Sequence, residues 1–210
     1  MNKVLKNSFR IILLSLVLFL IAGCNGKQAN VKAAGQTKNQ LSAWTVYWDA
    51  EEGSKEFRRL EKRLDEVCLF GAYFEEDGKL LLPEELTFDK RVAKKKKQLV
   101  EYLTIVNDRV LSDGGKEYKK TEFLQELLND QERRKEHIDE IIALAKAERF
   151  DGVEIDYERI WKDCETKDTF LPFIKELYAA TTANNLKLRV VLEPGTPFND
   201  IELPPGPKYV

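Results

Sequence analysis

Three acidic side chains alternate with apolar ones in the segment Asp151-Gly-Val-Glu-Ile-Asp-Tyr-Glu158. Glu154, Asp156 and Glu158 occupy every second position, so in a β-strand they share one face, roughly 6.6 Å apart at ~3.3 Å per residue. Like charges at this spacing raise one another's pKa and keep one carboxyl group protonated near neutral pH. Because a general acid must carry a proton, the spacing indicates acid–base catalysis.

The opposite face of the same segment is apolar. Two structures fit this alternation: an antiparallel strand with an acidic face in solvent, or a parallel strand whose polar face lines a barrel. Helix-like segments flank the strand and favour the parallel, buried alternative. Barrels of this kind carry their functional residues at the C-terminal ends of the strands. We therefore expect Glu158 at the open mouth, Asp156 behind it and Glu154 deepest.

Strand-like and helix-like segments alternate along the rest of the chain. The strand-like segments are residues 43–48, 66–74, 102–106, 150–157 and 186–192, and residues 208–210 resemble the start of a sixth. The helix-like segments are residues 54–65, 121–147 with a break near Asp130, and 170–183. This alternation predicts βα units around a parallel sheet, and hence an α/β fold.

The segment from Asp151 to Glu158 resembles the signature D-G-x-D-x-D-x-E of glycoside hydrolase family 18. Residues 66–82, with Asp77-Gly-Lys-Leu80, also resemble the second strand and hairpin of spore-cortex and chitinase-like members. The resemblance implies a (β/α)8 TIM barrel, of which this chain holds only about the first five to six βα units.

Family resemblance also implies a reaction. Members cleave β-linked N-acetylglucosamine polymers with retention, and the acetamido oxygen of the substrate acts as the nucleophile. Carried over, Glu158 is the proton donor, and Asp156 orients the acetamido group. Glu154 stands where the family has Asp, and the resemblance makes it the third catalytic candidate. The substrate would be chitin-like or peptidoglycan, and no metal or organic cofactor is implied.

Aromatic side chains near strand ends are candidates for stacking on sugar rings. Trp161 follows Glu158 closely, and Trp48 and Tyr73 lie at or just beyond the ends of earlier strands. Packing in the core or at the rim is the alternative for each of them. Glu193, at the end of the fifth strand, is a further candidate for binding substrate.

The N-terminus has the pattern of a secretory signal. Lys3, Lys6 and Arg10 precede an apolar run that is shorter than the ~20 residues a membrane-spanning helix needs. The run ends in Ile21-Ala-Gly-Cys24, which resembles the lipobox of bacterial lipoproteins. An ordinary secretory signal is the alternative. We expect a signal peptide over residues 1–23, lipidation of Cys24, and an extracytoplasmic protein anchored to the bacterial membrane.

Polar residues 24–40 predict a flexible tether, and residues 41–210 the barrel domain. The domain is mildly acidic, which argues against a nucleic-acid partner, and nothing indicates an obligate protein partner. Cys68 and Cys164 could pair outside the cell, or Cys68 could be a buried thiol. His137 lies in a charged helix-like segment and is expected at the surface, and the sequence offers no metal-ligand set.

A complete barrel would need later strands, which in the family carry further substrate contacts. Three interpretations follow: the chain is the N-terminal portion of a longer protein, another chain supplies the remainder, or the chain is a stable non-catalytic remnant. The rival to an enzyme is therefore a carbohydrate-binding lipoprotein with an incomplete barrel.

Overall fold

The computed structural model describes residues 40–162 and 164–210. The predicted signal peptide, the predicted lipidation site at Cys24 and the predicted tether up to residue 39 lie outside these residues. Among the described helices, none has both the length and the apolar character that crossing a membrane requires.

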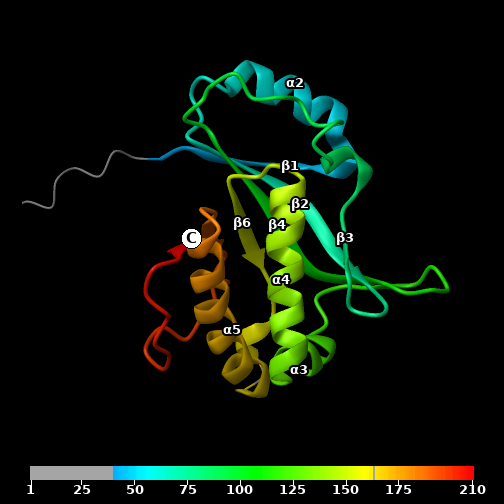
Figure 1. Ribbon diagram of the computed structural model, residues 1–210, viewed down its shortest axis with the longest axis vertical. Helices are drawn as coiled ribbons and strands as arrows, with labels where there is room; N and C mark the ends of the chain where they lie inside the picture. The colour runs from blue at the N-terminus through cyan, green and yellow to red at the C-terminus, as the bar shows by residue number, and fades with distance from the viewer. Residues whose placement is uncertain (1–39, 163) are drawn as a thin grey trace, which may run out of the picture. The chain divides into compact units, whose positions relative to one another are not determined.

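Six parallel strands form the sheet, in the order β1-β2-β4-β6-β7-β8 (Figure 1). The strands are β1 (Ser42–Val46), β2 (Glu66–Glu75), β4 (Val100–Val110), β6 (Gly152–Asp156), β7 (Lys187–Val190) and β8 (Lys208–Tyr209). Each predicted strand is present, including the start of the sixth. Since neighbours in the sheet follow one another along the chain, the sheet is the first part of a (β/α)8 barrel, which confirms the predicted fold class.

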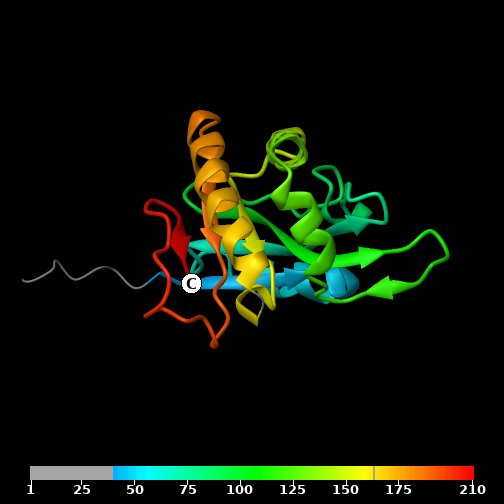
Figure 2. The ribbon, with the colours of Figure 1, turned by 90° about the horizontal axis from the view of Figure 1, so that it is seen from below.

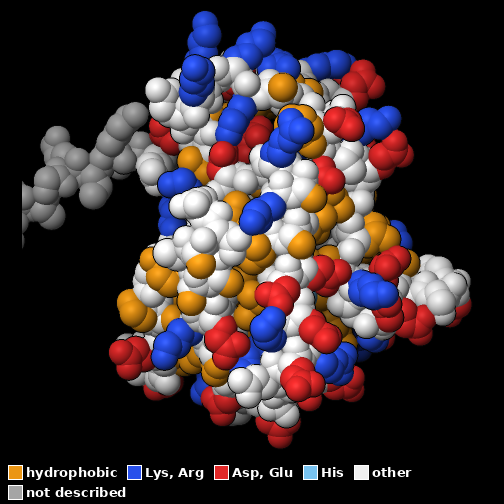
Figure 3. Space-filling model, viewed as in Figure 1, with side chains coloured by type: hydrophobic (Ala, Val, Ile, Leu, Met, Phe, Trp, Pro, Cys, Tyr) orange, Lys and Arg blue, Asp and Glu red, His pale blue; other side chains and the backbone are white. Residues whose placement is uncertain are grey.

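Helices connect most of these strands. They are α2 (Ala50–Leu60), α3 (Glu122–Asn129), α4 (Gln131–Ala147) and α5 (Cys164–Ala183), with short 3-10 turns η1 (Tyr47–Asp49), η2 (Glu84–Leu86) and η3 (Ile160–Lys162). Helices α4 and α5 lie side by side against the sheet (Figure 1). Lys and Arg side chains gather at the top of the face shown in Figure 3, over α2.

Two short strands extend the sheet as hairpins. β3 (Leu80–Leu81) pairs antiparallel with the end of β2, and β5 (Lys116–Glu117) pairs antiparallel with the end of β4. The β4–β5 hairpin projects beyond the sheet (Figure 2). The prediction that the third strand ends at residue 106 was therefore wrong, because pairing with β5 prolongs β4 to Val110.

The outer face of β6 is part of the hydrophobic core. Val153, Ile155 and Tyr157 are almost fully buried against α4 and α5. The Tyr157 ring stacks on Phe173 with centroids 6.0 Å apart, and its hydroxyl lies 2.9 Å from Nε2 of His137. The apolar half of the alternation thus packs under helices, as a parallel barrel strand requires.

His137 is buried rather than exposed, so the prediction of a surface position was wrong. It lies four residues before Ile141 on α4, and residues four apart share one face of a helix. Burial lowers the pKa of His137. The imidazole is a core residue that bonds to Tyr157, not a group of the acidic row.

The predicted break near Asp130 is present between α3 and α4. Asp130 has extended backbone angles, and its carboxylate accepts hydrogen bonds from the backbone N–H groups of Glu132 and Arg133, both at 2.9 Å. Asp130 is therefore the N-cap that starts α4. This helix carries the stripe of side chains that covers the outer face of β6.

Candidate active site

The acidic row lies on the inner face of the sheet and runs toward the C-terminal end of β6. Glu154 is fully buried within the strand, Asp156 is its last residue, and Glu158 follows two residues later; the last two are partly exposed. The order from deep to exposed is the predicted one. The row therefore leads from the barrel interior to the edge where parallel barrels carry their functional groups.

Glu154 is held by side chains from four other strands. Oε1 accepts hydrogen bonds from Nε1 of Trp44 at 2.8 Å and from Oγ1 of Thr104 at 2.7 Å. Oε2 lies 2.5 Å from Nε of Arg189 and 3.4 Å from Sγ of Cys68. Strand register brings this about, because Thr104 and Arg189 are the direct neighbours of Glu154 in β4 and β7. The Glu154 side chain, one methylene longer than the Asp of the signature, is thus bound by these partners in the barrel interior.

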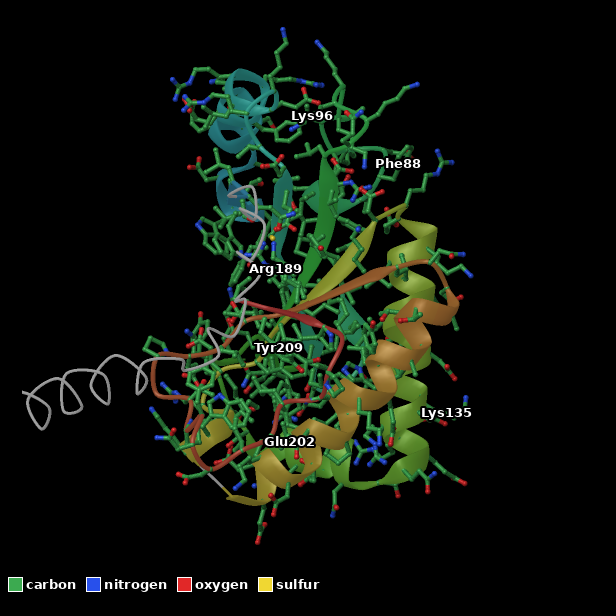
Figure 4. The ribbon with its side chains drawn as sticks, turned by 90° about the vertical axis from the view of Figure 1, so that its left-hand side faces the viewer. Phe88, Lys96, Lys135, Arg189, Glu202 and Tyr209 are labelled. Atoms are coloured by element: carbon green, nitrogen blue, oxygen red, sulfur yellow. The ribbon has the colours of Figure 1, made fainter. Side chains whose placement is uncertain are left out.

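Arg189, labelled in Figure 4, continues this network to Ser42 and Glu66, the first residues of β1 and β2. Its Nη1 donates to Oε2 of Glu66 at 2.8 Å and to Oγ of Ser42 at 3.0 Å. Nζ of Lys208 also donates to Glu66, at 2.6 and 2.7 Å. Burial opposes ionisation of Glu66, but the hydrogen bonds from Lys208 and Ser42 outweigh it and lower its pKa. We refer to Glu154, Arg189, Glu66, Ser42 and Lys208 as the inner network.

Asp156 is the carboxyl group whose pKa rises into the neutral range. Burial is the main cause, followed by the negative charges of Glu158 and Glu154, and together they raise its pKa to about 7. The expectation that the row keeps one carboxyl protonated near neutral pH thus applies to Asp156. Both protonation states of this group are accessible at physiological pH.

Glu158 is fixed through its backbone and paired through its side chain. The Asn107 amide accepts from the backbone N–H of Glu158 at 2.9 Å and donates to its carbonyl oxygen at 3.0 Å. The Glu158 carboxylate forms an ion pair with the ammonium group of Lys119, from the loop after β5. The next residue, Arg159, has a positive φ of 66°, which turns the chain sharply away from the strand.

The candidate aromatic residues occupy different surroundings. Trp48 is 63% exposed and meets Phe70 edge-on at 5.8 Å. Trp161 is half-buried, and its ring packs edge-on against Phe170 at 5.9 Å. Tyr73 is half-buried and lies on β2, with Tyr47 the nearest aromatic ring. Trp48 therefore offers the most open ring of the three.

A backbone hydrogen bond holds Glu193 next to the acidic row. Its Oε2 accepts a hydrogen bond from the N–H of Arg159 at 2.7 Å, and its charge contributes to the raised pKa of Asp156. The structure thus brings Glu193 into the same cluster as Asp156 and Glu158. Within the described residues, no side-chain hydrogen bond joins Trp48, Tyr73 or Trp161 to these carboxylates.

Several site residues were missed in the sequence: Asn107, Lys119, Trp44, Thr104 and Arg189. For Arg189 a signal existed, because a lone arginine in the apolar segment 186–192 must face a polar partner or the barrel interior. The alternation of side chains between the two faces of a strand could likewise have placed Trp44 on the inner face of β1. Nothing local marks Asn107 or Lys119, whose roles depend on contacts with a strand 39 or more residues away.

Cys68 is a free, buried thiol, so the second interpretation of this residue holds. Burial, and then the negative charge of Glu154, raises the pKa of Cys68, which leaves the sulfur protonated and unreactive. Within the described residues, no three acidic, Cys or His side chains are arranged to hold a metal ion.

A separate cavity of about 380 Å³ lies outside the barrel, between α2 and the outer faces of the first strands. Thr45, Phe57, Leu69 and Glu101 are among its lining residues. None of the acidic row lines it, so the inner face of the sheet is the better candidate for chemistry.

A partial parallel barrel with an acidic row at the C-terminal end of its fourth parallel strand is the arrangement that a barrel glycosidase requires. Residues 43–204 match the model of "Glycosyl hydrolases family 18". Since this match spans most of the chain, the protein belongs to glycosyl hydrolase family 18. A comparison with curated proteins found no match.

Solved structures share the fold at low sequence identity. The structure of a chitinase from Chromobacterium violaceum matches with a TM-score of 0.58 and 16% identity, over 73% of this chain and 46% of that one. The structure of the spore cortex-lytic enzyme SleL of Bacillus megaterium matches with a TM-score of 0.60 and 17% identity, over 78% of this chain and 36% of that one. A class V chitinase of Nicotiana tobaccum, solved in complex with NAG4, matches with a TM-score of 0.58 and 17% identity, over 74% of this chain and 44% of that one. The present chain therefore spans less than half of each of these chains.

Proposed function

We propose that this protein is a glycosidase that hydrolyses β-linked polymers containing N-acetylglucosamine. Its family membership and the location of Asp156 and Glu158 at the C-terminal edge of β6 support this activity. Related folds belong to proteins described as chitinases and spore cortex-lytic enzymes, so chitin-like glycans and peptidoglycan are the two substrate classes to test.

In the proposed mechanism Glu158 gives its carboxyl proton to the glycosidic oxygen as the bond to C1 breaks. The acetamido oxygen of the same sugar forms the new bond to C1, and Asp156 orients that group. Water then attacks C1, the bond between C1 and the acetamido oxygen breaks, and a proton of the water goes to the Glu158 carboxylate. Two successive displacements at C1 leave the product in the β configuration. Glu154 takes no direct part, since its oxygens accept hydrogen bonds from Trp44 and Thr104 and form an ion pair with Arg189.

The observation that carries this proposal is the pairing of Asp156, whose pKa is raised to about 7, with Glu158 at the strand end. Two carboxyl groups in unequal environments are typical of acid–base sites. Asn107 fixes the backbone of Glu158 from a neighbouring strand, and such preorganisation serves proton transfer.

Substrate assistance is tested with chito-oligosaccharides and their de-N-acetylated counterparts of equal length. Only the acetylated glycan should be cleaved, and ¹H NMR of the first product should give the β anomer. Equal cleavage of the de-N-acetylated glycan, or an α product, would contradict the mechanism.

A second candidate is a carbohydrate-binding protein without catalysis. The contact between Lys119 and the Glu158 carboxylate favours it, because a paired carboxylate is not free to donate a proton. Binding of chito-oligosaccharides without release of shorter products would establish this alternative over the enzyme.

We also propose that Cys24 is lipidated and anchors the protein outside the cytoplasm. The Ile21-Ala-Gly-Cys24 segment after a basic start and an apolar run supports this localisation. Cys24→Ser should move the protein from the membrane fraction to the soluble fraction. Unchanged membrane association would refute the anchor.

A further inference from the structure

Lys119 lies in the mouth of the proposed site, in ion-pair contact with Oε1 of Glu158. The side chains of Lys119 and Glu158 are 39% and 30% exposed, so a ligand that enters the mouth meets both. The cation is also close enough to affect Asp156, where it counteracts the rise in pKa that burial causes. Lys119 therefore faces the two groups assigned to the reaction.

The protein holds this lysine in place through its backbone. Lys119 has a φ of 56°, a left-handed conformation that is unfavourable for a residue with a side chain. Its N–H donates to Oδ1 of Asp108 at 3.0 Å. Asn107, which fixes the backbone of Glu158, also donates to the carbonyl oxygen of Lys120 at 3.4 Å. One buried amide thus couples the lysine loop to the proposed proton donor.

The ion pair between Lys119 and Glu158 opposes proton donation by Glu158. A general acid must carry a proton on the oxygen that approaches the leaving group. An ammonium group has three donors and no acceptor, so Lys119 takes up Oε1, one of the two oxygens of the Glu158 carboxylate. For Glu158 to donate a proton from this oxygen, the ammonium group must move away, and an anion on the ligand would be its natural new partner.

We propose that Lys119 is a specificity-determining residue that binds a carboxylate on the glycan, next to the scissile bond. The preferred substrate is then an acidic polymer of amino sugars rather than neutral chitin. A substrate carboxylate takes over the ammonium group and releases Glu158, whereas a neutral glycan offers no anion in exchange. The inference rests on the proposed function, of which it names the substrate class.

The test compares two glycans of equal length: peptidoglycan strands stripped of their peptides, which carry free carboxylates, and the same strands with these carboxylates reduced to alcohols. Both kcat/KM and the Kd from calorimetry are measured for the wild-type chain, Lys119→Met and Lys119→Arg. Lys120→Met is the matched control, since it removes the same charge from an exposed neighbouring residue.

We expect the wild-type chain to prefer the carboxylate form by about ten-fold or more, as for a hydrogen bond to a charged group. Lys119→Met should abolish the preference, while Lys119→Arg and Lys120→Met should keep it. Equal affinity and equal kcat/KM for both glycans in the wild-type chain, or an unchanged preference in Lys119→Met, would overturn the inference. Hydrolysis of neither glycan contradicts the proposed function instead, and the Kd ratio then still decides the role of Lys119.

Discussion

At the scale of single residues, three similar carboxylates acquire different chemistry from their surroundings. Glu154 is enclosed by donors from Trp44, Thr104 and Arg189. Asp156 is buried beside two other acids, and Glu158 reaches the mouth. Position along one strand therefore separates a structural carboxylate from the two proposed to act on substrate.

The raised pKa of Asp156 predicts how stability varies with pH. An acid whose pKa is higher in the folded state binds more protons there, so folding stability falls as pH rises from roughly 4 to about 7. Asp156→Asn does not titrate and should escape this loss. The difference in free energy of unfolding between Asp156→Asn and the wild type should therefore grow in favour of the variant across this pH window. One pKa unit corresponds to about 1.4 kcal/mol, and partial exposure of the group reduces the expected gain to the order of 2 kcal/mol.

Urea unfolding at pH 4, 5.5, 7 and 8.5 measures this difference. Asp200→Asn, an exposed aspartate in the loop after β7, is the matched control and should track the wild type at each pH. A constant difference between Asp156→Asn and the wild type would contradict the raised pKa.

The sequence was sufficient to place the acidic row and its order of depth, because alternation in a strand is a local property. It was not sufficient for the contacts that define each carboxylate. Glu66 and Arg189 are 123 residues apart, and Lys119 reaches Glu158 only because β4 and β6 are neighbours in the sheet. Such pairings follow from strand register, which the local pattern does not specify.

At the scale of elements, the apolar repeats predicted each main strand and the break between α3 and α4. The hairpin extension of β4 was missed because Asn107, Asp108 and Arg109 interrupt the apolar pattern. Pairing with β5 stabilises these residues as a strand, and Nε and Nη2 of Arg109 both donate to Oε2 of Glu117, at 2.9 and 2.6 Å. That extension carries the loop on which Lys119 lies.

The N-cap of α4 offers a direct test at this scale. Asp130→Ala removes the acceptor for two backbone N–H groups and should lower the free energy of unfolding by about 1 kcal/mol. Asp139→Ala, an exposed aspartate within the same helix, should have a smaller effect. Equal losses in urea denaturation would show that the cap does not stabilise the helix.

At the scale of the whole molecule, the inner network joins strands from both ends of the sheet. Arg189 on β7 binds Glu154 on β6 and Glu66 on β2, while Lys208 on β8 binds the same Glu66. These ion pairs connect strands on the inner face of the sheet, whereas the hydrophobic core under the helices lies on the outer face. The curvature that brings β8 close to β2 is therefore stabilised by charge.

Removal of the central cation should be costly. Arg189→Met leaves Glu154 without its ion pair and should destabilise the fold by about 3–5 kcal/mol, as expected when one partner of a buried pair is lost. Arg189→Met combined with Glu154→Gln should lose less than the sum of the two single variants. Additive losses in chemical denaturation would contradict direct coupling between these residues.

Glu158 carries the central claim, and its substitution tests that claim most directly. Hydrolysis of chito-oligosaccharides and of purified peptidoglycan is measured for the wild-type chain, Glu158→Gln, and Glu202→Gln as an exposed control far along the chain (Figure 4). We expect Glu158→Gln to lose at least about 100-fold in kcat with little change in Tm, as general acid catalysis contributes 10² or more, and Glu202→Gln to match the wild type. Equal activity in the wild type and Glu158→Gln, or none in the wild type, would contradict the account.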